Sequence, residues 1–564
     1  MPSRWRSGWI AALLATALVA VPTGCAGIPS SGPVIIGQDI DEQDSGDFEF
    51  FPARPMAGAS QEEILRGFVA AFTGSADNFG VARSFLSIDF ADDWNPRSTV
   101  TVRSSTEQFL PAGENTMEYS INAAAVVDST GAYRQNNSPQ PLTLQFAFVQ
   151  ENDEWRISAA SDGIVLSDAT FRSIYGKHAL YFLDPTGTRL VPDLRWFPGG
   201  TTARLRVVSA LLDGPPPWLR GAVRTAFPDG TQLEAPSVEV ESGVATVDLS
   251  TEALTASVSE RQLMQLQLTA SLENIASIRE VSISVSGSPL SIPELAFSPP
   301  QANPLVDARA VVFKDGGFGY LARDNIATLG ELSDKVVETG PRGATIADSV
   351  DTVAVLGASG VSIVRDGDVP TVLLDARADL ITPSLDNDGY VWSASRSDPS
   401  SLRVIDYSGA AVDIPTGLPA DARIASIDVS RDGARIAILL ATSTGPRLIV
   451  TAINRNPTGD RAPVGLSEAI LDANSQAGEA IDATWVDNLS IATLAVTGSQ
   501  GSVTLHEVGG ERTSLGLLDA ATSLVGGNGE AGLRAVGASG TVLARSGIGW
   551  TDLGIVVSFI ATQR

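Results

Sequence analysis

Few residues in this chain have side chains suited to catalysis. There is one cysteine, Cys25, and there are two histidines, His178 and His506. One cysteine cannot form a disulfide within the chain, and so few cysteines and histidines exclude zinc sites of the Cys/His type. A general base at His178 is conceivable, but no nucleophile motif accompanies it. We therefore interpret His178 as structural, and His506 as an outward polar position in an alternating strand.

Carboxylate pairs are more frequent, and paired carboxylates can support acid–base chemistry. The pairs are Asp92 with Asp93, Asp366 with Asp368, and Asp386 with Asp388. A glycosidase needs two carboxylates at a defined separation across a cleft, whereas pairs in turns are usually solvated. Asp386 to Gly389 also resembles part of a calcium loop, but no glutamate stands at the twelfth position. We therefore predict no catalytic residue, no metal and no cofactor.

Cys25 lies where a lipid anchor would be attached. A short basic stretch precedes an apolar run at residues 9–21, which is too short to span a membrane and is typical of a signal peptide. The residues before Cys25 resemble the bacterial lipobox, with Pro22 where leucine is preferred. We predict a signal peptide over residues 1–24, cleavage between Gly24 and Cys25, and N-acyl and S-diacylglycerol groups on Cys25. The alternative is a soluble secreted protein with a chance cysteine.

The rest of the chain is acidic and contains no second apolar run of that length, so we predict no transmembrane helix. The whole chain has 38 basic and 65 acidic residues, which give a net charge of −27. Nucleic-acid binding by phosphate neutralisation is therefore excluded for the chain as a whole. Residues 25–55 combine low hydrophobicity with acidic side chains, and we expect them to form an extended tether behind the lipid.

Residues 56–172 have the pattern of an α+β domain. Ser60 and Glu63 form a capping box in front of a helical apolar pattern, and residues 78–86 predict a second short helix. Strand patterns follow at residues 99–103, 117–127, 142–149 and 155–160. Helices followed by an antiparallel sheet resemble the nuclear-transport-factor-2-like fold, which serves both enzymes and binding modules.

Residues 173–295 predict a small α/β domain. A helical pattern ends at Asp213, residues 244–249 form a strand, and residues 281–286 form a half-exposed strand. We expect the helix between these strands to be capped by Ser259 and Gln262.

Residues 300–564 predict a β-propeller of about six blades. Short apolar strands alternate with Asp-Gly, Asn-Gly and Ser-Gly turns. Comparable strands begin near five positions with spacings of 36 to 58 residues, a period typical of propeller blades: Ala344, Leu380, Ile424, Asp482 and Thr522. A β-sandwich is the alternative.

Several stretches resemble the LpqB lipoproteins of actinobacteria. They are GCAGIPSSGPV at 24–34, LRWFP at 194–198, ALLDGP at 210–215 and ATVDLS at 245–250. The resemblance implies an α+β N-terminal domain, a GerMN domain and a propeller. It also implies a location on the outer face of the cell membrane and association with the sensor histidine kinase of the MtrAB two-component system, which influences cell-envelope homeostasis and division.

Two classes of function remain open. The first is a non-catalytic accessory lipoprotein, with Arg195, Arg220 and Arg224 as the candidate partner-binding residues because they form a basic cluster in an acidic chain. The second is a cell-envelope glycan or peptide hydrolase that uses a propeller cleft. Acidic side chains that converge at the centre of the propeller would favour the second class.

Overall fold

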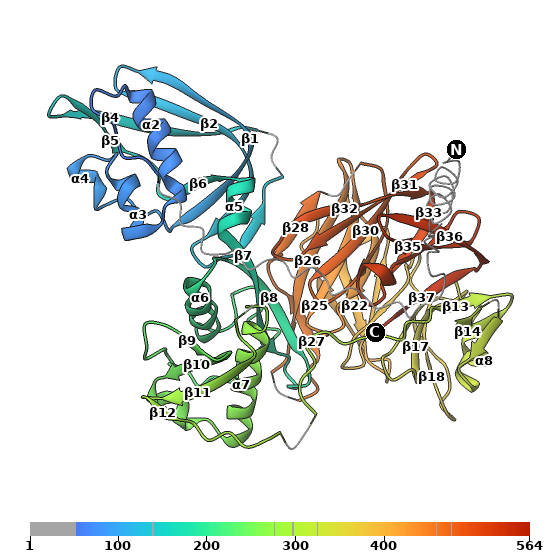
Figure 1. Ribbon diagram of the computed structural model, residues 1–564. Helices are drawn as coiled ribbons and strands as arrows, with labels where there is room; N and C mark the ends of the chain where they lie inside the picture. The colour runs from blue at the N-terminus through green and yellow to red at the C-terminus, as the bar shows by residue number, and fades with distance from the viewer. Residues whose placement is uncertain are drawn as a thin grey trace, which may run out of the picture. The chain divides into compact units, whose positions relative to one another are not determined.

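The computed structural model describes residues 52–564, apart from residues 138–139, 276, 296–297, 324, 458 and 475–476 (Figure 1). These residues belong to one compact unit, Asp44–Arg564. The predicted signal peptide, Cys25 and nearly all of the predicted tether lie outside the described residues.

Three helices open the first part of the fold: α2 (Gln61–Ala70), α3 (Ala76–Arg83) and α4 (Ile88–Ala91). The capping box is confirmed, because the Ser60 hydroxyl accepts from the Glu63 backbone and the Glu63 carboxylate accepts from the Ser60 backbone. The second predicted helix is shifted in the structure. Residues 77–79 have left-handed backbone angles, so α3 is kinked near its start, and it ends at Arg83.

These helices pack on a mostly antiparallel sheet of order β5-β4-β2-β1-β6, with β3 beside β2. The strands are β1 (Thr99–Gly113), β2 (Thr116–Asp128), β3 (Tyr133–Gln135), β4 (Leu142–Glu151), β5 (Glu154–Ala159) and β6 (Ile164–Ser167). Trp94 is buried at the centre of the core, with the Phe68 ring centroid 5.0 Å away. The predicted α+β class is confirmed, and α5 (Asp168–Ile174) ends this part.

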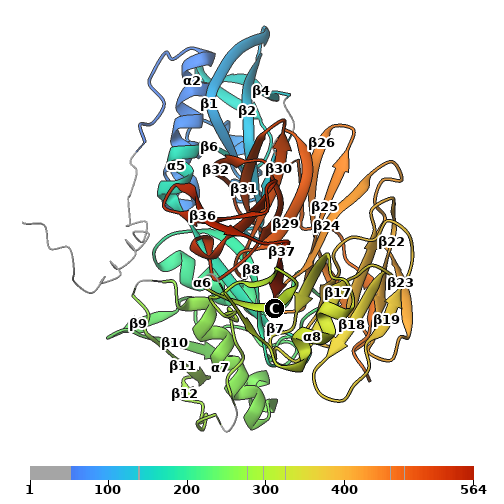
Figure 2. The same ribbon diagram turned by 90° about the vertical axis from the view of Figure 1, so that its right-hand side faces the viewer.

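The second part begins with a two-stranded ribbon, β7 (Tyr175–Leu183) and β8 (Leu190–Pro198). It continues through α6 (Thr201–Leu212) and α7 (Val258–Leu272) and the sheet β12-β11-β10-β9, with α7 lying across one face (Figure 2). The strands are β9 (Glu239–Glu241), β10 (Val244–Leu249), β11 (Glu280–Val285) and β12 (Ser288–Pro289). The predicted cap of α7 was wrong by two residues. Ser257 and Glu260 form the capping box, because the helix starts at Val258.

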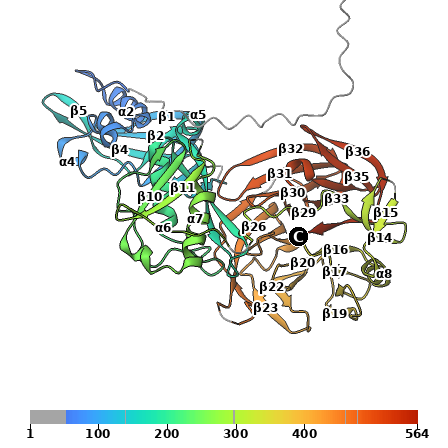
Figure 3. The same cartoon turned by 60° about the horizontal axis from the view of Figure 1, so that its bottom comes forward.

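The third part consists of four-stranded sheets around a common centre, and the described residues form six of these blades (Figure 3). Blade 1 contains β13 (Val311–Lys314), β14 (Gly317–Ala322), β15 (Asn325–Thr328) and β37 (Phe559–Gln563). Blade 2 contains β16 (Gly343–Ile346), β17 (Thr352–Leu356), β18 (Val361–Arg365) and β19 (Val372–Asp375), and follows α8 (Glu331–Glu338). Blade 3 contains β20 (Ser384–Leu385), β21 (Val391–Ser395), β22 (Asp398–Ile405) and β23 (Ala411–Pro415).

The other three blades follow in chain order. Blade 4 contains β24 (Arg423–Val429), β25 (Arg435–Thr442), β26 (Gly445–Arg455) and β27 (Pro463–Leu466), with β28 (Leu471–Asn474) also beside β26. Blade 5 contains β29 (Glu479–Trp485), β30 (Ser490–Thr497), β31 (Gln500–Glu507) and β32 (Arg512–Asp519). Blade 6 contains β33 (Ala521–Val525), β34 (Arg534–Gly537), β35 (Thr541–Ser546) and β36 (Gly549–Val556).

Strand β37 closes the propeller. It pairs antiparallel with β13 of blade 1 and parallel with β16 of blade 2, so the last strand of the chain completes the first blade. The predicted propeller is confirmed and the β-sandwich alternative is wrong. Four of the five predicted strand positions lie within inner strands of blades, and Leu380 lies shortly before the inner strand β20.

Polar side chains on the inner strands connect successive blades. The Ser384 hydroxyl accepts a hydrogen bond from the Val429 N–H at 3.0 Å, which joins blade 3 to blade 4. An Asp428 carboxylate oxygen accepts from the Trp485 N–H at 2.9 Å, and this bond joins blade 4 to blade 5. In both places a side-chain oxygen on one inner strand accepts from a backbone N–H of the next blade. This hydrogen bond satisfies a backbone group that would otherwise be buried without a partner.

Candidate functional site

The β7–β8 ribbon is contacted by residues of all three parts of the fold, and Trp196 on β8 is the residue that touches most of them. Its ring lies against Tyr133 and Phe171 of the first part, with centroids 5.3 Å and 5.0 Å away. Its indole N–H donates to the Gly509 carbonyl of blade 5 at 3.0 Å. Only 3% of Trp196 is exposed, because its side chain is covered by the first part of the fold and by the propeller.

Two ion pairs reinforce the same junction with the turn between β31 and β32. Lys177 lies 3.0 Å from Glu507, and Arg172 lies 2.8 Å from Glu511. The Arg172 side chain is 54% exposed, so solvent screens its pair and its contribution is small. The indole hydrogen bond of Trp196, whose side chain is buried, is not screened in this way.

Arg195 is the one candidate partner-binding residue whose predicted role was wrong. Only 7% of it is exposed, and its guanidinium lies 2.6 Å from Asp193 and 2.6 Å from the Thr130 hydroxyl. Burial raises the pKa of Asp193, and the arginine beside it opposes that rise. Arg195 therefore fastens the ribbon to the turn after β2 and does not reach a partner.

Arg220 and Arg224 are exposed, in the segment between α6 and β9. The backbone of Arg224 pairs with Leu183 of the ribbon, which fixes its position while the side chain stays in solvent. Between the two arginines, the Gly221 carbonyl accepts from the Arg455 N–H of blade 4 at 3.0 Å. Arg220 and Arg224 therefore belong to the segment whose backbone contacts the propeller.

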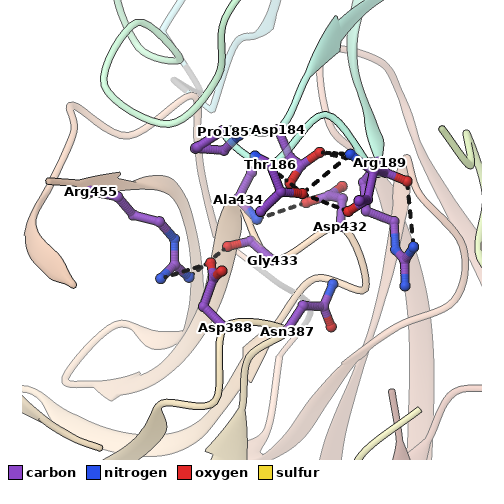
Figure 4. Close-up of a pocket in the computed structure, with 11 residues that line it drawn as sticks. Asp184, Pro185, Thr186, Arg189, Asn387, Asp388, Asp432, Gly433, Ala434 and Arg455 are labelled. Atoms are coloured by element: carbon purple, nitrogen blue, oxygen red, sulfur yellow. Dashed lines mark hydrogen bonds and ion pairs between the residues drawn. The ribbon is translucent and has the colours of Figure 1, made fainter. Parts of the chain in front are cut away.

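A small cavity lies between the turn of the ribbon and the turns of blades 3 and 4 (Figure 4). Its volume is about 100 Å³, which suits a few water molecules and no larger ligand. Its lining consists of Asp184, Pro185, Thr186, Thr188, Arg189, Asn387, Asp388, Asp432, Gly433, Ala434 and Arg455.

The charged residues of this cavity are committed to structural contacts. The Asp184 carboxylate accepts from the backbone N–H groups of Thr186, Thr188 and Arg189. Asp388 pairs with Arg455 at 3.3 Å and with Arg461 at 3.0 Å. The cavity is therefore a polar seam between two domains, and its carboxylates are not arranged for acid–base chemistry.

Three of the acidic residues near the centre of the propeller are also paired with arginines. Asp386 is 5% exposed and lies 2.7 Å from Arg455, so its predicted solvated position was wrong. Asp432 is paired with Arg435, and Asp428 is paired with Arg564. These carboxylates are therefore engaged in ion pairs within the propeller.

Two further ionisable groups lie in blade 5, His506 buried and Asp482 half-buried. His506 is 2% exposed, so the predicted outward position was wrong, and its ring nitrogen lies 3.1 Å from the Thr493 hydroxyl. Burial lowers the pKa of His506 to about 4 and raises the pKa of Asp482 to about 6. Elsewhere, His178 is 8% exposed and stacks on Phe197, with ring centroids 6.1 Å apart, as expected for a structural histidine.

The arrangement agrees with comparisons to known proteins. Residues 54–172 match the family model "Lipoprotein LpqB, N-terminal domain", and residues 320–558 match "Lipoprotein LpqB beta-propeller domain". Residues 179–291, between them, match "Sporulation and spore germination". The chain belongs to the LpqB lipoprotein family.

Relatives in that family have low sequence identity to this chain, but they match it over most of its length. Lipoprotein LpqB of Cutibacterium acnes is 26% identical over 538 residues, which cover 90% of each chain. Lipoprotein LpqB of Bifidobacterium longum is 28% identical and covers 78% of this chain and 77% of its own. Among solved structures, the first GerMN domain of the Bacillus subtilis sporulation protein GerM is 22% identical, with a TM-score of 0.18 over 22% of this chain and 92% of that domain.

Two features are absent from the described residues. No helix in this part of the chain is long and apolar enough to cross a membrane. Within the same residues, no group of three or more His, Cys, Asp and Glu side chains is placed to hold a metal ion.

Proposed function

We propose that this LpqB-family protein is a membrane-anchored accessory protein that acts by binding and not by turnover. The observation that carries the proposal is the use of its ionisable residues. Asp184 is held by backbone N–H groups of its own turn, Asp386 by Arg455 and Asp432 by Arg435, so these carboxylates serve the fold. A protein with this arrangement offers a fixed surface made of several domains, which suits recognition of a macromolecule.

The anchor of the proposed protein is the lipid on Cys25, with the folded part on the outer face of the cell membrane. The sequence of the lipobox-like stretch and the naming of the relatives as lipoproteins support this location. Several acyl chains on one cysteine give stable anchoring, whereas one chain alone binds a membrane marginally.

The proposed partner is the extracytoplasmic part of the sensor kinase of an MtrAB-type two-component system. The resemblance to LpqB proteins motivates this partner. The binding surface would include Arg220 and Arg224, because both are exposed and belong to the segment whose backbone contacts blade 4. Arg195 is excluded from this surface because it is buried.

The test is binding of the purified kinase domain to the double variant Arg220→Glu/Arg224→Glu. Two charge reversals at a contacting surface should weaken binding at least tenfold, an effect of about 1.4 kcal/mol or more. The matched control is Arg97→Glu/Arg134→Glu, which reverses two exposed arginines of the first part. Equal loss in both variants would show a general charge effect and reject the assigned surface.

The alternative function, a cell-envelope hydrolase, makes a different prediction. Release of soluble fragments from purified peptidoglycan by the wild type, and its loss on Asp386→Asn, would overturn the non-catalytic proposal. The circular dichroism spectrum of that variant must match the wild type, because Asp386 also supports Arg455.

A further inference from the structure

The outer edges of blades 5 and 6 flank an open cleft that none of the contacts described above uses. Its volume is about 440 Å³, larger than the polar seam beside the ribbon. The lining consists of four apolar residues, two carboxylates and two polar residues: Leu517, Leu518, Leu543, Trp550, Asp519, Asp552, Ser499 and Gln500. The space lies between the outermost strands of the two blades, β32 and β36.

The floor and the rim of this cleft differ in exposure. Leu518 and Leu543 are each 7% exposed and form the floor, whereas Leu517 on the rim is 58% exposed. Two further apolar side chains of blade 6, Ile548 and Leu553, stand in solvent nearby along β36 and the turn before it, at 95% and 44% exposure. Exposed apolar groups gathered in this way mark sites of interaction with other molecules.

The charge of the cleft has one sign. Asp519 and Asp552 are both exposed, and neither takes part in any ion pair formed among the described residues. Asp552 accepts one hydrogen bond, from the Gly554 N–H at 2.7 Å. No lysine or arginine lines the cleft, so a ligand with a positive group would meet two carboxylates whose charge is not neutralised.

The cleft is held open by contacts across the two blades. The Leu515 carbonyl of β32 accepts from the Trp550 indole at 3.1 Å and from the Arg545 guanidinium at 2.7 Å. Arg545 also donates to the Gly549 carbonyl at 3.3 Å and lies over the Trp550 ring, so its position is fixed within blade 6. A preformed site of this kind loses little conformational entropy when a ligand binds.

We propose that this cleft binds an extended, basic segment of a partner protein, with an apolar side chain over Leu518 and Leu543 and an arginine or lysine beside Asp519 and Asp552. Both flanking strands are edge strands, and β36 pairs on one side only, with β35. An extended segment fits along such an edge, because its alternate side chains point into the cleft and away from it. An anionic lipid surface is disfavoured by the two carboxylates.

The cleft is separate from the surface of Arg220 and Arg224. An experiment can therefore reject the binding role of one surface and leave the binding role of the other intact. Arg220 and Arg224 lie beside blade 4, whereas the cleft lies between blades 5 and 6. Because the two surfaces differ in charge, they would also select different parts of a partner or different partners.

The experiment measures binding of a fluorescent peptide in which arginine alternates with leucine to the purified full-length protein. Two control peptides replace leucine by serine or arginine by glutamate. We expect the arginine–leucine peptide alone to raise the fluorescence anisotropy and to change the emission of the tryptophans, and its affinity to fall as salt is added.

The decisive variants are Asp519→Asn/Asp552→Asn and Leu517→Ser, each of which should weaken binding of this peptide about tenfold. The matched control is Asp366→Asn/Asp368→Asn, which removes two exposed carboxylates in blade 2 and should change binding less than about twofold. Equal affinity of the wild type and the Asp519→Asn/Asp552→Asn variant would overturn the proposal, as would equal binding of the serine control peptide. Binding of a chitin oligosaccharide, blocked by Leu517→Ser, with no binding of the peptide would assign the cleft to a glycan instead.

Discussion

At the scale of single residues, blade 5 contains two ionisable groups, half-buried Asp482 and buried His506, whose pKa values move in opposite directions. The Asp482 carboxylate accepts from the Leu524 N–H of blade 6 at 2.9 Å, and burial raises its pKa to about 6. His506 contacts the Thr493 hydroxyl, and burial lowers its pKa to about 4. In both cases the fold favours the neutral form of the side chain.

The two pKa shifts make the stability of the fold depend on pH in opposite directions. Because the folded-state pKa of Asp482 is raised, its contribution to stability is present at low pH and is lost as the pH rises through about 6. The pKa of His506 is lowered, so its contribution is present above its ordinary pKa and is lost as the pH falls toward about 4. In the wild type the two effects oppose each other over the same range of pH.

Replacing Asp482 should therefore reveal the effect of His506. In Asp482→Asn, the free energy of unfolding should gain about 2 kcal/mol relative to the wild type between about pH 4.5 and about pH 7. Urea unfolding at both values measures this change, and Asp366→Asn is the control because Asp366 is exposed. A difference between Asp482→Asn and the wild type that stays constant with pH would contradict the assignment.

At the scale of elements, the β7–β8 ribbon holds the three parts of the fold together. Its Lys177 pairs with blade 5, and its Arg195 donates to Thr130 in the turn after β2. Its Trp196 donates to blade 5 and also packs on the first part of the fold. An element with partners on every side is well suited to keep the exposed arginines and the propeller in a fixed relation.

Removing the indole hydrogen bond should loosen this junction. In Trp196→Phe the ring remains but the Gly509 carbonyl loses its donor, and we expect a loss of about 1 kcal/mol in stability. Hydrogen exchange in the turn between β31 and β32 should become faster. Trp94→Phe is the matched control, because Trp94 is equally buried but its indole nitrogen has no hydrogen-bond partner. Equal exchange in that turn for both variants would show that the hydrogen bond does not hold the junction.

The sequence predicted those elements whose signals are local. The capping box of Ser60 and Glu63 involves residues three apart, and the strands of the blades repeat an apolar pattern between turns, so both could be located. The cap of α7 was misplaced because two overlapping pairs, Ser257 with Glu260 and Ser259 with Gln262, fit the same spacing.

The junction and the cleft depend on contacts that local signals do not encode. Trp196 and Gly509 are 313 residues apart, and no pattern near either residue indicates the other. The burial of Arg195 did have a local signal that was missed. Asp193 and Arg195 are two apart on one strand, so their side chains share a face and can pair.

At the scale of the whole molecule, the proposed account joins a lipid anchor, a tether and a rigid binding body. Residues 27–55 of the proposed tether number 29, and if they formed a coil it would span about 30 Å, enough for the body to search the layer next to the membrane. Confinement to that layer raises the effective concentration toward a membrane partner, and a gain of about a hundredfold in apparent affinity is ordinary for such tethering.

The most direct test measures autophosphorylation of the MtrAB-type sensor kinase in liposomes as lipidated wild-type protein is added. We predict that the rate changes and that the change saturates near one protein per kinase, because the protein binds and does not turn over. The Cys25→Ser variant, which carries no lipid, should need about a hundredfold more protein for the same effect. An unchanged rate at every ratio of lipidated protein to kinase would contradict the account.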